Sequence, residues 1–210
     1  MHSDEMSDNE CLQNTVMGVA HDGMMVLELG VAMGISTRAI ADVVKEYKGN
    51  LVAIDNWPNE EMYCQFLMDC HSYKNVISPH RINLFTIDTL FLDGQFDLIH
   101  FDACYTWPDV KLMIQRYLPK LKHGGVVCGH GAEFYWGALS NNVKELLKIY
   151  HNKVTIPILP DGEVAQAVLI SQTPDIPFQV HANLSRALYE IFHDDYKICG
   201  EHTYWSRTME

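Results

Sequence analysis

Residues 24–37 read MMVLELGVAMGIST, and this stretch decides the fold. Met24–Leu29 is an apolar run with one acidic residue, which predicts a strand covered on both faces, as in a parallel sheet. Gly30 and Gly34 follow, and a helix with one apolar face is predicted to begin near Ser36. A strand, a glycine loop and a helix in this order form the first half of a βαβ unit.

The alternation of strands and helices continues along the chain. Further strands are predicted at Leu51–Ile54, Ile82–Ile87, Phe96–Phe101 and Val126–Gly129, and helices at Asn59–Tyr73, Pro108–Leu121 and Asn141–Tyr150. Two apolar runs, Val154–Leu159 and Val164–Ile170, then flank the turn sequence Pro-Asp-Gly and predict an antiparallel hairpin. The sequence therefore predicts an α/β fold with a doubly wound, mostly parallel sheet and an antiparallel C-terminal hairpin strand.

One domain is predicted for residues 1–210, because no linker, repeat or low-complexity tract interrupts the chain. Residues 1–23 are predicted to be an N-terminal extension with a short helix, and residues 24–171 the core. Residues 172–210 are predicted to be a C-terminal extension that contains a helix from Leu184 to Phe192.

Composition and charge narrow the function classes. The net charge of −12 repels phosphate backbones, and the basic residues are scattered singly, so no nucleic-acid partner is expected. The acidic start MHSDEMSDNE is unlike a signal peptide, and no apolar run reaches membrane-spanning length. The six cysteines form no CxxC pair, and they are interpreted as reduced thiols of a cytoplasmic protein without a membrane partner.

The glycine loop is the first candidate binding site, because ligands of open parallel sheets bind at the carboxyl ends of the strands. Its pattern is E-x-G-x-x-x-G, beginning at Glu28. A dinucleotide fingerprint requires glycines where Ala32 and Ile35 stand, which weakens an NAD-binding oxidoreductase as a distant third hypothesis. Asp55 ends the next strand, where a carboxylate accepts hydrogen bonds from ribose hydroxyls. The alternative is that the two glycines only form a tight turn.

Three segments together resemble a known family: VLELGVAMGIST, LVAIDNW and FDLIHFDACYTWPDVKLMIQRYLPKLKHGGVVCGHG. They are similar to class I S-adenosyl-L-methionine-dependent methyltransferases, in particular the catechol O-methyltransferase-like branch that acts on small molecules and sugars. The resemblance covers Met24 to Ile170. It implies a Rossmann-like sheet of seven strands, of which the last is antiparallel.

The resemblance also implies roles for individual residues. Glu28, Gly30 and Gly34 would hold the methionine part of S-adenosyl-L-methionine, with Ser36 of the same loop also among the cofactor-binding residues. Asp55 would bind the ribose. Asp88 and Thr89 would lie near the adenine, although an Asp-Thr pair also caps helices. A Gly30→Arg substitution is accordingly expected to abolish donor binding and leave the fold intact.

Two residues are candidates for the chemistry on the acceptor. His130 is predicted to act as a general base, with Asp102 orienting it or the acceptor. Relatives often carry a His-Asp pair that contributes to a metal site, but Gly131 stands here in place of that aspartate. A divalent cation held by Asp102, His130 and Glu133 remains an alternative that is not favoured, because the set contains few oxygen ligands.

The first functional hypothesis is an enzyme that methylates a hydroxyl group of a small molecule or sugar by in-line transfer. The second is a non-catalytic binding or interaction protein on a methyltransferase scaffold, because a fold does not establish activity. A homodimer is a further open expectation, since dimers are common among such enzymes. The identity of the acceptor does not follow from the sequence.

Overall fold

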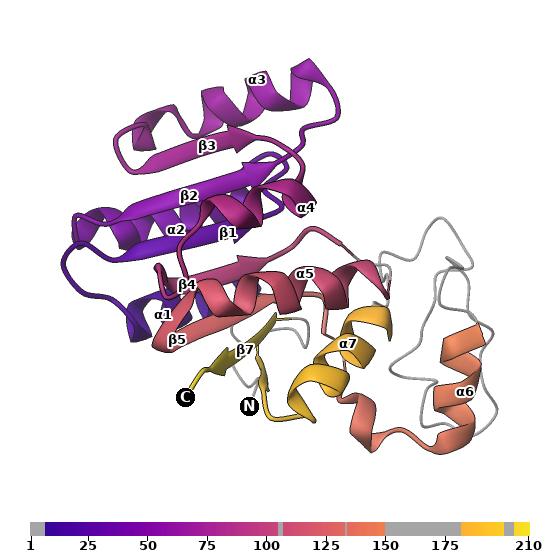
Figure 1. The fold of residues 1–210 in the computed structure, drawn as a ribbon. Helices are drawn as coiled ribbons and strands as arrows, with labels where there is room; N and C mark the ends of the chain where they lie inside the picture. Colours follow the sequence, from indigo (N-terminus) through magenta and orange to yellow (C-terminus); the bar gives the residue numbers. More distant parts are fainter. Residues whose placement is uncertain (1–6, 105–106, 133, 150–181, 200–203) are drawn as a thin grey trace, which may run out of the picture.

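The computed structural model describes residues 7–104, 107–132, 134–149, 182–199 and 204–210 (Figure 1). This part of the chain contains a seven-stranded sheet with the order β3-β2-β1-β4-β5-β7-β6. The strands are β1 (Met25–Leu29), β2 (Asn50–Asp55), β3 (Ile77–Arg81), β4 (Phe96–Phe101), β5 (Leu121–His130), β6 (Lys197–Cys199) and β7 (Tyr204–Thr208). Strands β1 to β5 pair in parallel, whereas β7 runs antiparallel to β5 and to β6. The predicted fold class is confirmed.

Helices cover both faces of the sheet (Figure 1). One face carries α1 (Asp8–Gly18), α2 (Ile35–Glu46) and α3 (Glu60–Asp69), and the other carries α4 (Leu84–Ile87), α5 (Asp109–Tyr117) and α7 (Ala182–Phe192). A further helix, α6, spans Asn141–Ile149. Short 3₁₀ turns lie at His71–Tyr73, Asp88–Leu90, Leu118–Lys120 and Trp136–Ala138.

The two hydrophobic cores explain the continuous apolar strands. Because side chains alternate across a sheet, Val26 packs with α1 and α2 on one face, and Leu27 and Leu29 pack with α5 on the other. The central strands β1 and β4 are therefore buried on both sides, as their sequences predict.

The strand prediction at 82–87 is wrong. The strand is β3, Ile77–Arg81, which pairs with β2 at the edge of the sheet, and the apolar residues from Leu84 to Ile87 form helix α4 instead. Strand β3 reads ISPHR and is largely exposed, so it lacks the apolar pattern of a strand. Its proline is tolerated because an edge strand leaves some N–H groups unpaired.

Two antiparallel strands, β6 and β7, lie later in the sequence than the predicted hairpin. The hairpin predicted at 154–170 falls outside the described residues, whereas β6 and β7 belong to the segment predicted as a C-terminal extension. Strand β6 is three residues long, and β7 reads YWSRT, so neither carries a clear alternating pattern. Division of the chain into an extension, a core and a second extension stays a prediction.

The interpretation of all six cysteines as reduced thiols is also wrong. A disulfide joins Cys11 in α1 to Cys199 in β6, across 188 residues, while the other four cysteines are free thiols. Such a distant pair cannot be deduced from spacing, because it depends on α1 packing beside the C-terminal strands. Among the residues that the structure describes, no helix has the length and apolarity that crossing a membrane requires.

Candidate active site

A cavity of about 310 Å³ opens where the strand order reverses, at the carboxyl ends of β1, β2, β3 and β4. Leu29 is in register with Ile54 of β2 and with Phe101 of β4, so the loops that follow these strands meet at one edge. The cavity is lined by Gly30, Val31, Ala32, Asp55, Asn56, Asn83, Leu84, Phe85, Asp102, Ala103 and Cys104. Its size falls in the range of small-molecule sites.

Gly30 is required by the protein's own backbone. Its φ of +86° lies in the left-handed region, and a Cβ built on it would overlap the carbonyl oxygen of Asp102. The chain after β4 comes this close because the Asp102 N–H donates to the Leu29 carbonyl at 2.8 Å. The expectation that Gly30→Arg leaves the fold intact is therefore wrong.

Gly34 is also constrained by packing. It precedes α2 with a φ of +80°, and an added Cβ would come within 2.7 Å of Cys70 Sγ and 3.0 Å of the Phe66 ring. The residue does not line the cavity. Its predicted contact with the methionine part of the donor remains a prediction, whereas its contact with the α3 region is a feature of the fold.

Asp55 fastens the glycine loop to the end of β2. Its Oδ2 accepts the backbone N–H groups of Val31 and Ala32 at 2.8 and 3.0 Å, and its Oδ1 accepts the Trp57 N–H at 2.8 Å. An ionised carboxylate has about four acceptor positions, so three backbone bonds leave capacity for a ligand hydroxyl. The carboxylate lines the cavity, where the sequence places the ribose.

Trp57 is a structural residue of the site whose role the sequence does not reveal. Its fully buried ring packs on Tyr63 and Phe66, and its indole N–H donates to the Ala32 carbonyl at 2.7 Å. Ala32 and Trp57 both have positive φ values, of 47° and 35°. Positive φ is unfavourable for residues with a Cβ, so hydrogen bonds between the two loops stabilise a strained backbone next to the cavity.

Glu28 lies behind the loop and not in the cavity wall. It is completely buried, and its Oε1 accepts the Ser36 hydroxyl at 2.6 Å and lies 3.4 Å from His100 Nδ1. Its Oε2 is buried and has no hydrogen-bond partner among the described residues. The structure thus brings Glu28 and Ser36 together, and adds His100, which sequence reasoning missed although a histidine within an apolar strand is an unusual signal.

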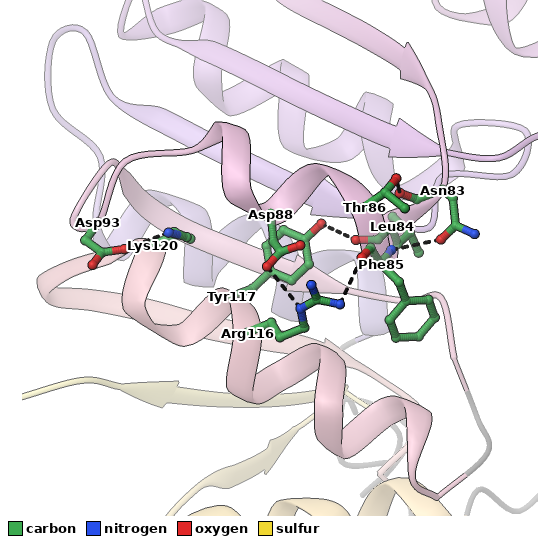
Figure 2. Close-up of polar contacts among 9 residues, drawn as sticks. All are labelled: Asn83, Leu84, Phe85, Thr86, Asp88, Asp93, Arg116, Tyr117 and Lys120. Atoms are coloured by element: carbon green, nitrogen blue, oxygen red, sulfur yellow. Dashed lines mark hydrogen bonds and ion pairs between the residues drawn. The ribbon is translucent and has the colours of Figure 1, made fainter.

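Asp88 and Thr89 do not line the cavity. The Asp88 carboxylate is directed to α5, where its Oδ2 lies 3.0 Å from Arg116 Nε (Figure 2). The wall on this side is formed instead by Asn83, Leu84 and Phe85. Asn83 precedes α4, and Leu84 and Phe85 are its first two residues. The contact of Asp88 and Thr89 with the adenine stays a prediction.

Asp102 and His130 occupy different surroundings. Asp102 lines the cavity, whereas His130 does not, and His130 Nε2 lies 3.4 Å from Asp8 Oδ2 in α1. Glu133 lies outside the described residues. Within the described ranges, no group of three histidine, cysteine or acidic side chains is arranged to hold a metal ion.

The cavity is acidic. Asp55 and Asp102 line it, and no lysine or arginine is among the described lining residues. Cys104 adds no charge, because burial raises the pKa of its thiol to about 11. Such a lining favours a ligand with positive charge and disfavours the pyrophosphate of a dinucleotide. A nucleoside that carries a sulfonium and an ammonium group fits these residues.

Comparison with solved structures confirms the fold. A protein from Staphylococcus aureus assigned as a caffeoyl-CoA O-methyltransferase is 19% identical, with 96% of this chain and 82% of that chain covered and a TM-score of 0.60. A protein from Klebsiella pneumoniae assigned as an O-methyltransferase is 14% identical, with 100% and 82% covered and a TM-score of 0.61. The O-methyltransferase TomG from Streptomyces achromogenes, solved with S-adenosylmethionine, is 14% identical, with 96% and 79% covered and a TM-score of 0.57.

Comparison of the sequence with family models is more specific than the comparison of folds. No curated protein is significantly similar to it in sequence. A family model described as a methyltransferase domain matches residues 27–132, half of the chain, from the first strand to the loop after β5. The match spans the segments that line the cavity and confirms the predicted enzyme class, a methyltransferase that uses S-adenosyl-L-methionine. The chain therefore belongs to the methyltransferase domain family.

Proposed function

We propose that this protein transfers the methyl group of S-adenosyl-L-methionine to a hydroxyl group of a small molecule or sugar. The observation that carries the proposal is the acidic cavity at the reversal of strand order, in a chain of the methyltransferase family. The choice of oxygen as the acceptor atom draws on the structural relatives, which are described as O-methyltransferases.

The residues suited to hold the donor lie on two sides of the cavity. Asp55 is suited to accept the ribose hydroxyls, and the Asn83–Phe85 wall is suited to contact the adenine. The backbone of Gly30–Ala32 would face the methionine part, with the carboxyl group of Glu28 buried behind it. When bound, the donor supplies an electrophilic methyl group on a sulfonium, which is a good leaving group.

The acceptor hydroxyl needs a group that receives its proton and aligns its oxygen. Asp102 is the candidate with the better position, because it lines the cavity beside Ala103 and Cys104. Cys104 is a neutral thiol at physiological pH, since burial raises its pKa to about 11. His130 remains a candidate general base from sequence alone, and its contact with Asp8 weighs against that role.

Titration calorimetry with S-adenosylhomocysteine tests the proposal, with NAD as the matched control ligand. Binding of the first and not of the second is expected, and no binding at millimolar S-adenosylhomocysteine contradicts the proposal. Turnover is then measured with methyl-labelled donor and a panel of hydroxylated acceptors. Donor binding without any turnover would instead support the non-catalytic alternative.

The two candidate bases are separated by the kcat values of two variants. Asp102→Asn should lower kcat by at least about tenfold, whereas His130→Gln should leave kcat within about twofold. The reverse result would restore His130 as the base. Activity after EDTA treatment, with and without added Mg²⁺, tests the divalent cation separately.

The other expectations about the protein's surroundings remain proposals. A homodimer and the absence of nucleic-acid and membrane partners rest on the sequence alone. Cytoplasmic location is weakened as a proposal by the disulfide between Cys11 and Cys199, because disulfides persist mainly in oxidising compartments.

A further inference from the structure

Helix α4 forms one wall of the cavity but is too short to be stable by itself. It spans only four residues, Leu84–Ile87, and both Leu84 and Phe85 line the cavity. A helix of one turn pays the full cost of nucleation and leaves its carbonyl groups without partners within the helix. The position of this wall therefore depends on groups outside α4.

One of these groups is the Asn83 side chain, whose Oδ1 accepts the Phe85 N–H at 2.9 Å, and the others come from the end of α5, as Figure 2 shows. The Tyr117 hydroxyl donates to the Leu84 carbonyl at 2.6 Å, and Arg116 Nη1 donates to the Phe85 carbonyl at 2.8 Å. Arg116 Nε also contacts Asp88 Oδ2 at 3.0 Å, just after α4. Arg116 and Tyr117 together are named the α4 clamp below.

The α4 clamp is a defined arrangement of donors. Tyr117 is 1% exposed, and burial raises the pKa of its hydroxyl well above the usual value, so the group stays protonated as a donor. Arg116 presents two N–H groups of one guanidinium to two acceptors, a geometry that lysine does not reproduce. Neither residue lines the cavity, so each acts on it only through the backbone of Leu84 and Phe85.

We propose that Arg116 and Tyr117 are positioning residues for donor binding, which hold the Asn83–Phe85 wall where the nucleoside part of the donor packs. The inference rests on the proposed function, because the wall matters only if a nucleoside binds beside it. Loss of either side chain lets the wall shift, and the affinity for the nucleoside falls while the chemistry on the acceptor is unchanged.

The chain offers a matched control a few residues away. Lys120 forms an ion pair with Asp93 at 2.7 Å, and Asp93 is 75% exposed (Figure 2). This pair joins the segment after α5 to a loop that does not line the cavity. Lys120→Met therefore removes a polar contact near α5 without changing the α4 clamp.

The experiment measures the dissociation constant of S-adenosylhomocysteine and the steady-state constants of the intact protein. Tyr117→Phe removes only the hydroxyl, and we expect it to weaken binding roughly fivefold to tenfold. The affinity for 5′-methylthioadenosine, which lacks the amino-acid part, should fall by the same factor. The donor KM should rise by that factor, with kcat and the acceptor KM unchanged, and Lys120→Met should change none of these values.

Arg116→Met and Arg116→Lys give a second, independent test at a partly exposed side chain. Arg116→Met should weaken the binding of S-adenosylhomocysteine to a similar extent. Arg116→Lys should weaken it less. If the clamp variants lower only the melting temperature and bind the ligand as the unmodified protein does, the inference is overturned and the proposed function stands. If the unmodified protein does not bind S-adenosylhomocysteine, the proposed function itself fails.

Discussion

The two walls of the cavity are held in place by different means. The first wall, Gly30–Ala32, is fastened by backbone N–H groups to Asp55 and by the Trp57 indole, all within the first βαβ unit. In the second wall, Asn83–Phe85, the carbonyl groups of Leu84 and Phe85 accept hydrogen bonds from side chains about thirty residues later, in α5. The first wall requires a glycine at position 30 and an aspartate at position 55. The second wall is bound through backbone carbonyl groups, which every residue has.

This difference predicts how the walls respond to mutation. Substitutions in the first wall should affect folding and donor binding together, because the loop is a place where β1, β2 and β4 approach one another. Substitutions that act on the second wall should affect mainly donor binding. The disulfide between Cys11 and Cys199 provides a reference for this contrast, because its loss should affect unfolding alone.

The largest effect should come from a site remote from both walls. Cys11→Ser or Cys199→Ser opens a loop of 188 residues and should lower the free energy of unfolding by about 2 to 5 kcal/mol, as measured in urea. The affinity for S-adenosylhomocysteine should not change. The exposed free cysteine Cys64 provides the control, and Cys64→Ser should alter neither quantity.

Counting thiols checks the same disulfide directly. The denatured protein should show four reactive thiols without reductant and six after reduction. Six thiols in both samples would mean that the cysteines are reduced, as the sequence alone suggests.

Gly30→Ala should be the most damaging single change in the first wall. The added Cβ overlaps the Asp102 carbonyl at a positive φ, so the free energy of unfolding should fall by about 3 kcal/mol. Gly94→Ala is the matched control, since Gly94 has a φ of +65° and no atom within 4 Å of the added Cβ. Gly94→Ala should lower the free energy of unfolding by about 1 kcal/mol. An equal loss in both variants would show that the close approach of Asp102 to Gly30 is unimportant.

Asp55→Asn should weaken the binding of S-adenosylhomocysteine about 30-fold, which equals about 2 kcal/mol of binding free energy. Both Asp55 oxygens accept backbone N–H groups, so an amide places its NH₂ against one of these donors. Calorimetry with Asp93→Asn as the control measures the effect. An affinity within twofold of the unmodified protein would remove Asp55 from the donor site.

Trp57→Phe should have a smaller effect, about 1 kcal/mol in unfolding free energy, because only the hydrogen bond to the Ala32 carbonyl is lost while most ring packing remains. Trp205→Phe is the comparison. Trp205 is equally buried, but its Nε1 has no hydrogen-bond partner among the described residues. Urea denaturation of both variants separates the hydrogen bond from the packing, and the expected difference disappears if the Trp57 bond contributes nothing.

The first wall could be predicted from the sequence because its constraints are visible as residue types. Gly30 and Asp55 stand at the ends of two clear apolar strands, and the structure brings both to the cavity. The reason for the glycine differs, however. Gly30 makes room for the chain after β4, a contact between segments some seventy residues apart that no local pattern reports.

The second wall could not be predicted. The exposed edge strand β3 lacks an apolar pattern, so the sequence predicts the strand at 82–87 and does not indicate that Asn83–Phe85 line the cavity. Two of the residues that line the cavity, Leu84 and Phe85, are bound through their carbonyl groups by Tyr117 and Arg116. Similarly, β7 lies in the sheet by pairing with β5, although its own sequence resembles a polar tail.

The bond between Cys11 and Cys199 also makes the polypeptide a covalent ring over most of its length. A protease that cuts one exposed loop between these positions leaves two fragments that remain attached to each other. Such nicked protein would migrate as a single species on a denaturing gel and separate into two bands only after a reducing agent is added.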